Sequence, residues 1–328
     1  MRILIVKTSS LGDVVHTLPA LTDAARALPE LRCDWLVERP FAEIPAWHPA
    51  VDRVITCDLR RWRKRPLKTL LNGDWQRFRA ELRQREYAYA IDAQGLLKSA
   101  WLGWQARGPL IGADAASARE PLAACFYRHR YPVPAHGAAH AIERTRRLFA
   151  QALGYPLPEQ TGAPDAGLNR SQFPPPDLTA PYAVFLHGTT WPSKRWPLAH
   201  WQTLGASLAA RGLRIVLPWG NADERADAET IAAACNGHVL PRLGLTALAG
   251  WLAAARIVVG VDTGLMHLAA ALGTPGLSLY GPTLPQRTGA WGRNQHWLWN
   301  ETATTIDRNR PLNILPATVL GNLNKLLA

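Results

Sequence analysis

The first nineteen residues, MRILIVKTSSLGDVVHTLP, constrain the fold of this chain more than any other segment. The four apolar residues 3–6 predict a buried strand, and the polar residues 7–10 predict a short loop. Gly12 and Asp13 then open a helix whose apolar residues follow directly. A strand, a tight loop and a helix in this order are typical of the first unit of a doubly wound α/β domain.

Asp13 distinguishes this unit from those that bind dinucleotides. Such units carry G-x-G-x-x-G, and the pyrophosphate of the ligand rests on the helix N-terminus. Here the glycine pattern is missing, and the Asp13 carboxylate at the helix start would repel a pyrophosphate. These differences argue against a dehydrogenase. A carboxylate suits a proton acceptor, so the first domain is predicted to receive an acceptor rather than to hold a nucleotide.

The length of 328 residues predicts two domains. The segment 161–182, TGAPDAGLNRSQFPPPDLTAPY, is rich in proline, glycine and polar residues and contains the expected linker. We expect an acceptor domain over 1–165, a linker over 166–182 and a ligand-binding domain over 183–310. Residues 311–328 are expected to form a helix that packs back on the first domain.

Short apolar runs alternate with helical stretches in both halves, which predicts two doubly wound parallel sheets with helices on both faces. Two such domains are expected to form a cleft, with ligands at the C-terminal ends of the strands. The expected strands are 3–6, 34–37, 53–56, 90–92, 110–111, 183–186, 215–217, 257–261 and 276–279. The expected helices are 13–28, 73–86, 96–107, 140–153, 198–211, 223–235, 245–255, 264–272 and the C-terminus.

The net charge of +12 indicates an anionic partner, such as nucleic acid, a membrane surface or a phosphorylated substrate. Residues 60–68, RRWRKRPLK, contain six cations and no acid. Charge runs are usually solvated faces, but the missing acids and the enclosed Trp62 favour an anion-binding loop. Trp62 and Trp75 are candidates to contact lipid headgroups or sugar rings. The candidate anion-binding cations are Arg60, Arg61, Arg63, Lys64, Arg65 and Lys68, extended by Lys98, Arg119 and the group Arg144, Arg146 and Arg147.

Two turns in the second half follow apolar strands and fit a phosphate-bearing ligand. In FLHGTTWPSKRWP (185–197), the hydroxyls of Thr189 and Thr190 and the charge of Lys194 suit phosphate oxygens. In LPWGNADER (217–225), Glu224 is a candidate to accept hydrogen bonds from ribose hydroxyls. The plainer interpretations are that the two threonines cap the next helix and that Glu224 is a solvated helix residue.

A third turn, VVGVDTGLMHLAAALG (258–273), has the same form. Its strand ends at Asp262, and Thr263 and Gly264 begin a helix whose free amides suit a diphosphate. His267 is expected to face the same ligand, although a lone histidine is more often a packed, half-buried residue. Three such turns at successive strand ends favour the ligand-binding interpretation.

The four cysteines, Cys33, Cys57, Cys125 and Cys235, are scattered and predict buried free thiols in a reducing compartment. No signal peptide and no apolar run of membrane-spanning length is apparent. The sequence therefore predicts a cytoplasmic protein that is able to rest on a membrane.

Seven motifs, in their joint order, resemble those of the ADP-heptose:lipopolysaccharide heptosyltransferases of glycosyltransferase family 9. The resemblance is closest to the members that add the first heptose to the Kdo region of the inner core. It covers the chain up to about residue 285. The motifs are KTSSLGDVVHTLPAL, RRWRK, IDAQGLLKSA, AREPLA, FLHGTTWPSKRWP, LPWG with the following ER, and VDTGLMHLAAALGTP with the following YGPT.

The resemblance implies a GT-B architecture and inverting transfer of L-glycero-D-manno-heptose from ADP-heptose to Kdo2-lipid A. It implies no metal site and no obligate cofactor, with Mg²⁺ at most stimulating the reaction. The implied setting is the cytoplasmic face of the inner membrane of a Gram-negative bacterium, with an anionic membrane surface as a peripheral partner. We expect a monomer and no nucleic-acid partner.

The resemblance also implies roles for individual residues. Asp13 is implied as the catalytic base, and Lys194 is implied to stabilise the leaving diphosphate. The implied ADP-heptose contacts are Thr189, Thr190, Lys194, Glu224 (ribose), Leu243 (adenine, through its backbone), Asp262, Thr263, Gly264 and His267. The implied acceptor contacts are Ser10, Arg60, Arg61, Arg63, Lys64, Lys98 and Arg119.

Two alternatives remain at this point. One is a related heptosyltransferase that adds a later core heptose, because acceptor choice cannot be read from one sequence. The other is a basic nucleic-acid-binding protein, which the charge alone suggests but which has no need of Asp13, Lys194 or the D-T-G turn.

Overall fold

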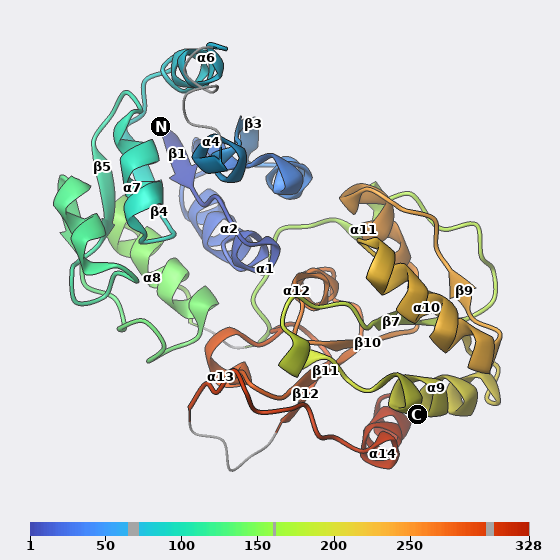
Figure 1. Cartoon of the computed structure of the whole chain (residues 1–328). Helices are drawn as coiled ribbons and strands as arrows, with labels where there is room; N and C mark the ends of the chain where they lie inside the picture. The colour runs from blue at the N-terminus through green and yellow to red at the C-terminus, as the bar shows by residue number, and fades with distance from the viewer. Residues whose placement is uncertain (65–71, 160–161, 300–304, 328) are drawn as a thin grey trace. The chain divides into compact units, whose positions relative to one another are not determined.

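The chain divides into two compact units, residues 1–161 with 165–167 and residues 162–164 with 168–328. The computed structural model describes residues 1–64, 72–159, 162–299 and 305–327. Each unit holds a six-stranded sheet in which every strand pair is parallel, with helices on both faces (Figure 1). The two doubly wound parallel sheets predicted from the sequence are therefore confirmed.

The first unit has the strand order β3-β2-β1-β4-β5-β6. Its strands are β1 Arg2–Val6, β2 Arg32–Glu38, β3 Val51–Cys57, β4 Tyr89–Asp92, β5 Leu110–Ala113 and β6 His129–Tyr131. Its α-helices are α1 Leu11–Val15, α2 Leu18–Ala27, α3 Glu43–Ala46, α4 Leu59–Lys64, α6 Asp74–Leu82, α7 Leu97–Trp104 and α8 Ala141–Leu153. Its 3-10 helices are η1 Arg39–Phe41 and η2 Pro121–Phe126.

The second unit has the strand order β12-β11-β10-β7-β8-β9, which is the same winding. Its strands are β7 Tyr182–Leu186, β8 Arg214–Leu217, β9 His238–Val239, β10 Ile257–Val261, β11 Gly276–Tyr280 and β12 Gln295–Trp299. Its α-helices are α9 Leu198–Ala209, α10 Ala222–Cys235, α11 Leu245–Ala254, α12 Gly264–Ala271, α13 Pro285–Thr288 and α14 Pro316–Leu327. Its 3-10 helices are η3 Arg170–Gln172 and η4 Pro192–Lys194.

The strand order fixes where a ligand site can form in each unit. In the first unit the order reverses between β1 and β4, where Val6 is paired with Asp92. In the second it reverses between β7 and β10, where Leu186 is paired with Gly260. Ligands of open α/β sheets bind at the carboxyl ends of the strands at such a reversal. Asp13, Lys194 and Asp262 lie in the segments that directly follow β1, β7 and β10.

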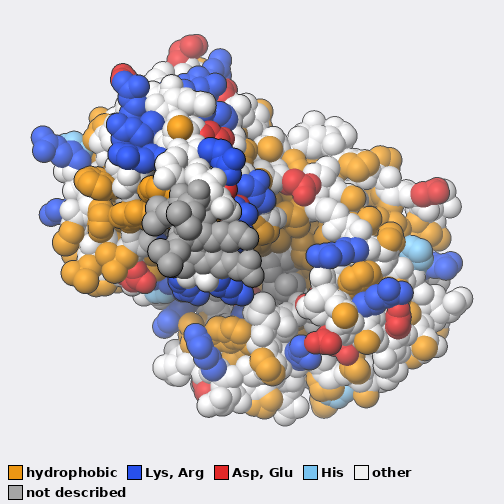
Figure 2. Space-filling view, turned by 45° about the horizontal axis from the view of Figure 1, so that its top comes forward, with side chains coloured by type: hydrophobic (Ala, Val, Ile, Leu, Met, Phe, Trp, Pro, Cys, Tyr) orange, Lys and Arg blue, Asp and Glu red, His pale blue; other side chains and the backbone are white. Residues whose placement is uncertain are grey.

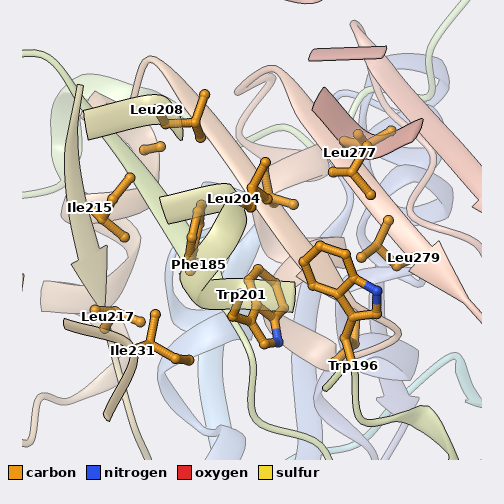
Figure 3. Packing of buried hydrophobic residues seen from close by; sticks show 14 of the residues in the cluster. Phe185, Trp196, Trp201, Leu204, Leu208, Ile215, Leu217, Ile231, Leu277 and Leu279 are labelled. Atoms are coloured by element: carbon orange, nitrogen blue, oxygen red, sulfur yellow. The ribbon is translucent and has the colours of Figure 1, made fainter. Parts of the chain in front are cut away.

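A hydrophobic core fixes the loop after β7. Trp201 of α9 is fully buried beside Phe185 of β7, and Trp196 contacts Trp201 edge-on at 4.9 Å (Figure 3). The Trp196 indole N–H donates to the Ile314 carbonyl at 2.7 Å. The indole N–H of a buried tryptophan usually finds a hydrogen-bond partner, as that of Trp196 does here. The core therefore anchors the loop two residues beyond Lys194.

The expected helix over 13–28 is wrong, because two shorter helices, α1 and α2, occupy this stretch. Pro19 has no amide hydrogen to donate to the Val15 carbonyl, so a single helix cannot continue through it. The basic run is also not a loop: its described part forms α4, where the Trp62 amide donates to the Asp58 carbonyl. Arg65 and Lys68 lie outside the described residues.

The sequence missed the strands β6, β9 and β12, two of which are only two or three residues long. Most of the segment expected as a linker packs on the second unit, since Phe173 is buried and Arg170 donates to the Ala253 carbonyl. The C-terminal helix belongs to the second unit rather than the first. Its Val319 and Leu323 enter the same core as Trp201, because its apolar face meets α9.

Cys33, Cys57 and Cys235 are buried free thiols as expected, whereas Cys125 is exposed. None of the described helices is both long enough and apolar enough to span a membrane.

Candidate active site

Asp13 lies in the first turn of α1, directly after the loop that follows β1. Its Oδ2 accepts hydrogen bonds from the Ser10 amide at 2.8 Å and from the Ser10 hydroxyl at 3.2 Å. Its Oδ1 lies 4.0 Å from Lys7 Nζ. The Asp13 side chain stays 31% exposed, so a ligand can reach the carboxylate. Ser10, expected as an acceptor contact, is therefore a direct partner of the expected base.

The charges around Asp13 keep it ionised. Burial alone would raise the pKa of the Asp13 carboxyl. The charge of Lys7, the hydrogen bonds from Ser10 and the charge of Arg119 lower it. Together they outweigh burial, so this pKa lies below its ordinary value. Burial in turn lowers the pKa of the Lys7 ammonium, against the attraction of Asp13 and Asp92. An ionised carboxylate beside an accessible surface is able to accept a proton from a hydroxyl.

Gln94, in the loop after β4, holds the β1 loop in place. Its Oε1 accepts hydrogen bonds from the Thr8 amide and hydroxyl at 2.8 and 2.9 Å, and its Nε2 donates to the Ser9 carbonyl at 2.6 Å. Asp92, 1% exposed, accepts from the amides of Gln94 and Gly95. Sequence reasoning missed Gln94 as a positioning residue, although the motif IDAQG contains it.

A small pocket of about 40 Å³ opens beside this loop. Its lining includes residues 92–95, Arg119 and Arg144. Arg144 is fixed by donating to the carbonyls of Pro134 and Ser117 at 2.7 and 2.6 Å, whereas Arg119 is exposed. Two guanidinium groups at one pocket favour an anionic group of a ligand, as the sequence analysis expected for Arg119 and Arg144.

The other predicted cations differ in their availability. Arg61 forms ion pairs with Asp58 and Asp74 at 3.1 and 3.2 Å, so its charge is already used to hold α4. Among the described residues, no acid pairs with Arg60, Arg63, Lys64, Lys98 or Arg119. Because these five form no ion pair among the described residues, they are better candidates than Arg61 to meet an anionic ligand.

Two of these cations converge at the end of β2. Burial raises the pKa of Glu38, and the charges of Arg60 and Lys98 act against this effect. Both cations therefore lie near Glu38. By contrast, Arg146 forms a buried ion pair with Asp23 and Arg147 pairs with Glu143, so these two are structural.

In the second unit, Lys194 and Asp262 meet. Lys194 Nζ lies 2.7 Å from Asp262 Oδ2, although the two residues come from loops after different strands. The Thr189 hydroxyl donates to the Asp262 carbonyl at 3.3 Å, while Thr190 is exposed. Neither threonine caps a helix, since the caps of η4 and α9 are Trp191 and Pro197. The capping interpretation is therefore wrong.

Asp262 has two further neighbours. The Thr283 hydroxyl donates to its Oδ2 at 2.6 Å, and His267 Nε2 lies 4.0 Å from its Oδ1. Thr263 is the N-cap of α12, which Gly264 begins. The first amides of α12 form a partial positive charge beside Lys194. Sequence reasoning missed Thr283, although it belongs to the motif YGPT.

Glu224 lies between the loops that follow β7 and β8. Its Oε2 accepts the Gly220 amide at 2.7 Å, and its own amide donates to the side chain of the N-cap Asn221. His187 Nε2 contacts the Glu224 carbonyl at 2.9 Å. Glu224 is thus held by both loops and is not simply a solvated helix residue.

Leu243, expected at the adenine, lies half-buried in the loop between β9 and α11. The Trp219 indole donates to the Leu240 carbonyl at 2.6 Å and so ties this loop to the loop after β8. Among the described residues, no hydrogen bond or ion pair joins Leu243 to Lys194 or Asp262. In the part of the chain that the structure describes, no group of three His, Cys, Asp or Glu side chains is placed to hold a metal ion.

Comparisons with known proteins show the family to which this chain belongs. Residues 75–318 match the sequence pattern of glycosyltransferase family 9 (heptosyltransferase). The lipopolysaccharide heptosyltransferase 1 of Pseudomonas aeruginosa is 60% identical over 297 residues, covering 90% of this chain and 82% of that protein. The solved structure of E. coli heptosyltransferase WaaC with ADP is 44% identical and superposes with a TM-score of 0.90, covering 99% of this chain and 100% of that chain.

A second WaaC structure, with ADP-2-deoxy-2-fluoro heptose, is 43% identical, has a TM-score of 0.88 and covers 99% of both chains. The family resemblance seen in the sequence motifs is therefore confirmed, and it favours a glycosyltransferase over the nucleic-acid-binding alternative. Asp13, Lys194 and the D-T-G turn all follow strands at which the strand order of a sheet reverses. The chain belongs to glycosyltransferase family 9, the heptosyltransferases.

Proposed function

We propose that this protein transfers L-glycero-D-manno-heptose from ADP-heptose to the Kdo of Kdo2-lipid A, with inversion at the anomeric carbon, in the synthesis of the lipopolysaccharide inner core. One observation carries the proposal. An ionised, accessible carboxylate, Asp13, stands at the strand reversal of one unit, and a cation, Lys194, stands beside a helix N-terminus at the reversal of the other. Glycosyl transfer needs these two kinds of group.

The donor is assigned to the second unit. Lys194 and the first amides of α12, at Thr263 and Gly264, are suited to the diphosphate, as are the hydroxyls of Thr189 and Thr190. Glu224 is assigned to the ribose and the Leu243 backbone to the adenine, with Asp262 and His267 near the heptose. The names of the two WaaC structures support the donor class, since they contain ADP and an ADP-heptose analogue.

The chemistry follows from these positions. The hydroxyl oxygen of the acceptor attacks the anomeric carbon of the heptose, and Asp13 takes the proton of that hydroxyl. The bond from that carbon to the diphosphate breaks, and ADP leaves from the opposite side. Lys194 and the α12 amides neutralise the negative charge that grows on the leaving diphosphate. These groups supply the stabilisation within the chain, so we propose no obligate metal, with Mg²⁺ at most stimulating turnover.

The acceptor is assigned to the first unit. Kdo carries a carboxylate, and the cations without an acidic partner, Arg60, Arg63, Lys64, Lys98 and Arg119, are suited to it and to lipid A phosphates. A lipid-anchored acceptor implies a peripheral location at the cytoplasmic face of the inner membrane. We propose that the protein acts there as a monomer.

The direct test is to incubate the purified protein with ADP-heptose and Kdo2-lipid A and to measure the product mass and anomeric configuration. We expect one added heptose with inverted configuration, both without divalent cations and with Mg²⁺. Transfer only to an acceptor that already carries a heptose would instead identify an enzyme acting later in the core. No transfer to either acceptor would reject the proposed reaction.

Replacing Gly188 with Ala is expected to weaken donor binding. A Cβ at Gly188 would lie 2.6 Å from Glu224 Cδ, so the carboxylate has to move and lose its 2.7 Å bond to the Gly220 amide. We expect the Kd for ADP to rise about tenfold, because the free energy lost is that of one hydrogen bond to a charged group. Gly321→Ala is the matched control, because nothing lies within 4 Å of a Cβ there. Unchanged ADP affinity, measured by calorimetry, would contradict the assignment of Glu224 to the ribose.

Replacing Arg63 and Lys64 together with Ala is expected to weaken the use of the acceptor more than that of the donor. Both side chains are exposed and lack an acidic partner among the described residues, so their loss leaves the fold of α4 intact. We expect the KM for Kdo2-lipid A to rise about tenfold and to depend less on salt, with the KM for ADP-heptose unchanged. An equal rise of both KM values would show that these cations act on the structure rather than on the acceptor.

A further inference from the structure

The outer face of α7 carries large apolar side chains that remain exposed. Leu97, Trp101 and Trp104 are spaced i, i+4 and i+7, so they lie on one face of the helix. Their exposed fractions are 40%, 40% and 61%. The opposite face, with Ala100 and Leu102, is buried in the core of the first unit. The helix is therefore apolar on the solvent side as well as on the core side.

The 3-10 helix η2 extends this apolar surface. Leu122 of η2 is 65% exposed, and the ring of Phe126 contacts that of Trp104 with centroids 6.4 Å apart. Of the eight large hydrophobic residues that are strongly exposed in the described chain, four lie on α7 and η2. We call Leu97, Trp101, Trp104, Leu122 and Phe126 the α7–η2 face. Clustering of this kind marks an interaction surface, because single exposed apolar residues are ordinarily scattered.

Cations border the α7–η2 face. Trp62 of α4 contacts Trp75, and Trp75 stacks on Trp101 of α7 with ring centroids 4.7 Å apart. These rings connect α4 to α7. The exposed Arg63 and Lys64 of α4 therefore lie beside the face. Arg130 donates to the Ala124 carbonyl of η2 at 2.9 Å. Figure 2 shows hydrophobic side chains gathered on this part of the first unit with Lys and Arg side chains beside them.

Glu120 is an acid at the edge of the α7–η2 face. Its Oε2 accepts the Leu97 amide at 2.7 Å, so its charge is directed at the N-terminus of α7. Asp74, next to Trp75, is already paired with Arg61 and Arg77. Lys98, the next residue along α7, is exposed, and its charge acts to lower the pKa of Glu38. The border of the face is therefore predominantly positive.

We propose that the α7–η2 face binds the surface of an anionic phospholipid bilayer. Indole rings favour the boundary between acyl chains and headgroups, because one part of the ring is apolar and its N–H remains polar. The bordering cations favour anionic headgroups, and an apolar contact combined with basic charge gives a reversible peripheral attachment. A second copy of this chain fits the face less well, since it would bring like charges together.

This inference rests on the proposed function for its purpose, because a lipid-anchored acceptor lies in such a surface. The test uses the full chain and vesicles of equal parts phosphatidylglycerol and phosphatidylcholine, with flotation as the readout. The double variant Trp104→Ser/Leu122→Ser removes the two most exposed side chains of the face. We expect its partition to fall about tenfold. Leu315→Ser in the second unit, at a residue that is 60% exposed, is the matched control and should float as the parent does.

A second variant, Leu122→Glu, adds an acid at an exposed position that does not disturb packing. It should weaken binding to the anionic vesicles further and leave the thermal midpoint of the protein unchanged. Flotation of either variant equal to that of the parent would overturn the proposal. Parent binding that is as strong on pure phosphatidylcholine would also overturn it, because the bordering cations would then play no part. A dimer that is lost in the double variant while vesicle binding persists would assign the face to self-association instead.

A transfer assay separates this inference from the proposed function. With a Kdo acceptor freed of its lipid, the double variant should keep the activity of the parent, because neither Trp104 nor Leu122 is among the residues assigned to the donor or to the acceptor sugar. With Kdo2-lipid A in vesicles, its rate should fall along with flotation. If the parent transfers heptose to no acceptor but its flotation depends on the α7–η2 face, the proposed reaction is rejected and the membrane-binding role of the face is supported. If heptose is transferred but flotation does not depend on the α7–η2 face, the membrane-binding role of the face is rejected and the proposed reaction is supported.

Discussion

Replacing Asp13 with Ala is expected to lower the rate of heptose transfer by about 10²–10⁴-fold, the range that a positioned general base contributes. The carboxylate is the ionised group at the strand reversal of the first unit, and two hydrogen bonds from Ser10 fix its direction. ADP affinity should stay within about twofold of the parent, because all the assigned donor contacts lie in the other unit. Single-turnover kinetics and calorimetry on the same preparations measure the two quantities.

Asp13→Asn is the matched control for this substitution. Asparagine keeps the size and can still accept hydrogen bonds from Ser10, but it cannot take a proton at neutral pH. It should therefore be as inactive as the alanine variant while its thermal midpoint remains close to that of the parent. Activity retained in Asp13→Asn would show that the residue orients the acceptor without acting as a base.

The pH dependence follows from the electrostatics of Asp13. Its lowered pKa means that the base stays ionised as the pH falls from neutral towards the ordinary range of a carboxyl, and activity is lost only below that range. The folded-state pKa is below the unfolded value, so the ionised group also stabilises the fold above the unfolded pKa. This contribution disappears as the pH falls through the folded pKa. Lys7→Met removes the nearest cation, so it should move the acid limb of the rate profile to higher pH.

Replacing Lys194 with Ala is expected to slow transfer by about 10²–10³-fold, the effect of removing one group that stabilises developing charge. The ammonium group is held 2.7 Å from Asp262 and beside the N-terminus of α12, where the leaving diphosphate is assigned. The loss should appear mainly in kcat, because negative charge on the diphosphate grows during bond cleavage. Steady-state kinetics with varied ADP-heptose distinguish kcat from KM.

Two variants make the Lys194 result specific. Lys194→Arg keeps the charge and should recover part of the rate, which a purely structural role would not show. Thr283→Val removes the 2.6 Å hydrogen bond to Asp262 without removing a charge, so it should slow transfer less than Lys194→Ala does. Near-normal turnover of Lys194→Ala would mean that the α12 amides alone stabilise the leaving group.

Local sequence patterns predicted most of the strands, and they placed Asp13, Lys194 and Asp262 after the C-terminal ends of strands, where the structure has them. The apolar runs at residues 3–6 and 257–261 are continuous because both faces of a parallel sheet are covered, and this pattern is strong. The turns that follow such runs then lie at the strand ends by topology alone. For this reason Asp13, Lys194 and Asp262 were identified before their contacts were known.

The contacts across loops were not predictable in the same way. The Gln94 bonds to the β1 loop and the Thr283 bond to Asp262 join segments 85 and 21 residues apart, and nothing local in the sequence encodes them. The short edge strand β9 has only two residues, too few for a periodic pattern. The C-terminal helix was misplaced because its apolar face fits any exposed apolar surface, and only the tertiary structure shows that α9 provides it.

The most direct test of the account is a single turnover with ADP-heptose bound in advance and Kdo2-lipid A added in excess, followed in the parent and in Asp13→Asn. The account predicts that the parent converts its bound donor to ADP and heptosylated acceptor, while Asp13→Asn binds the donor equally well and leaves it intact. Equal conversion by both proteins, or a variant that no longer binds ADP-heptose, would contradict the assignment of the base to the first unit and of the donor to the second.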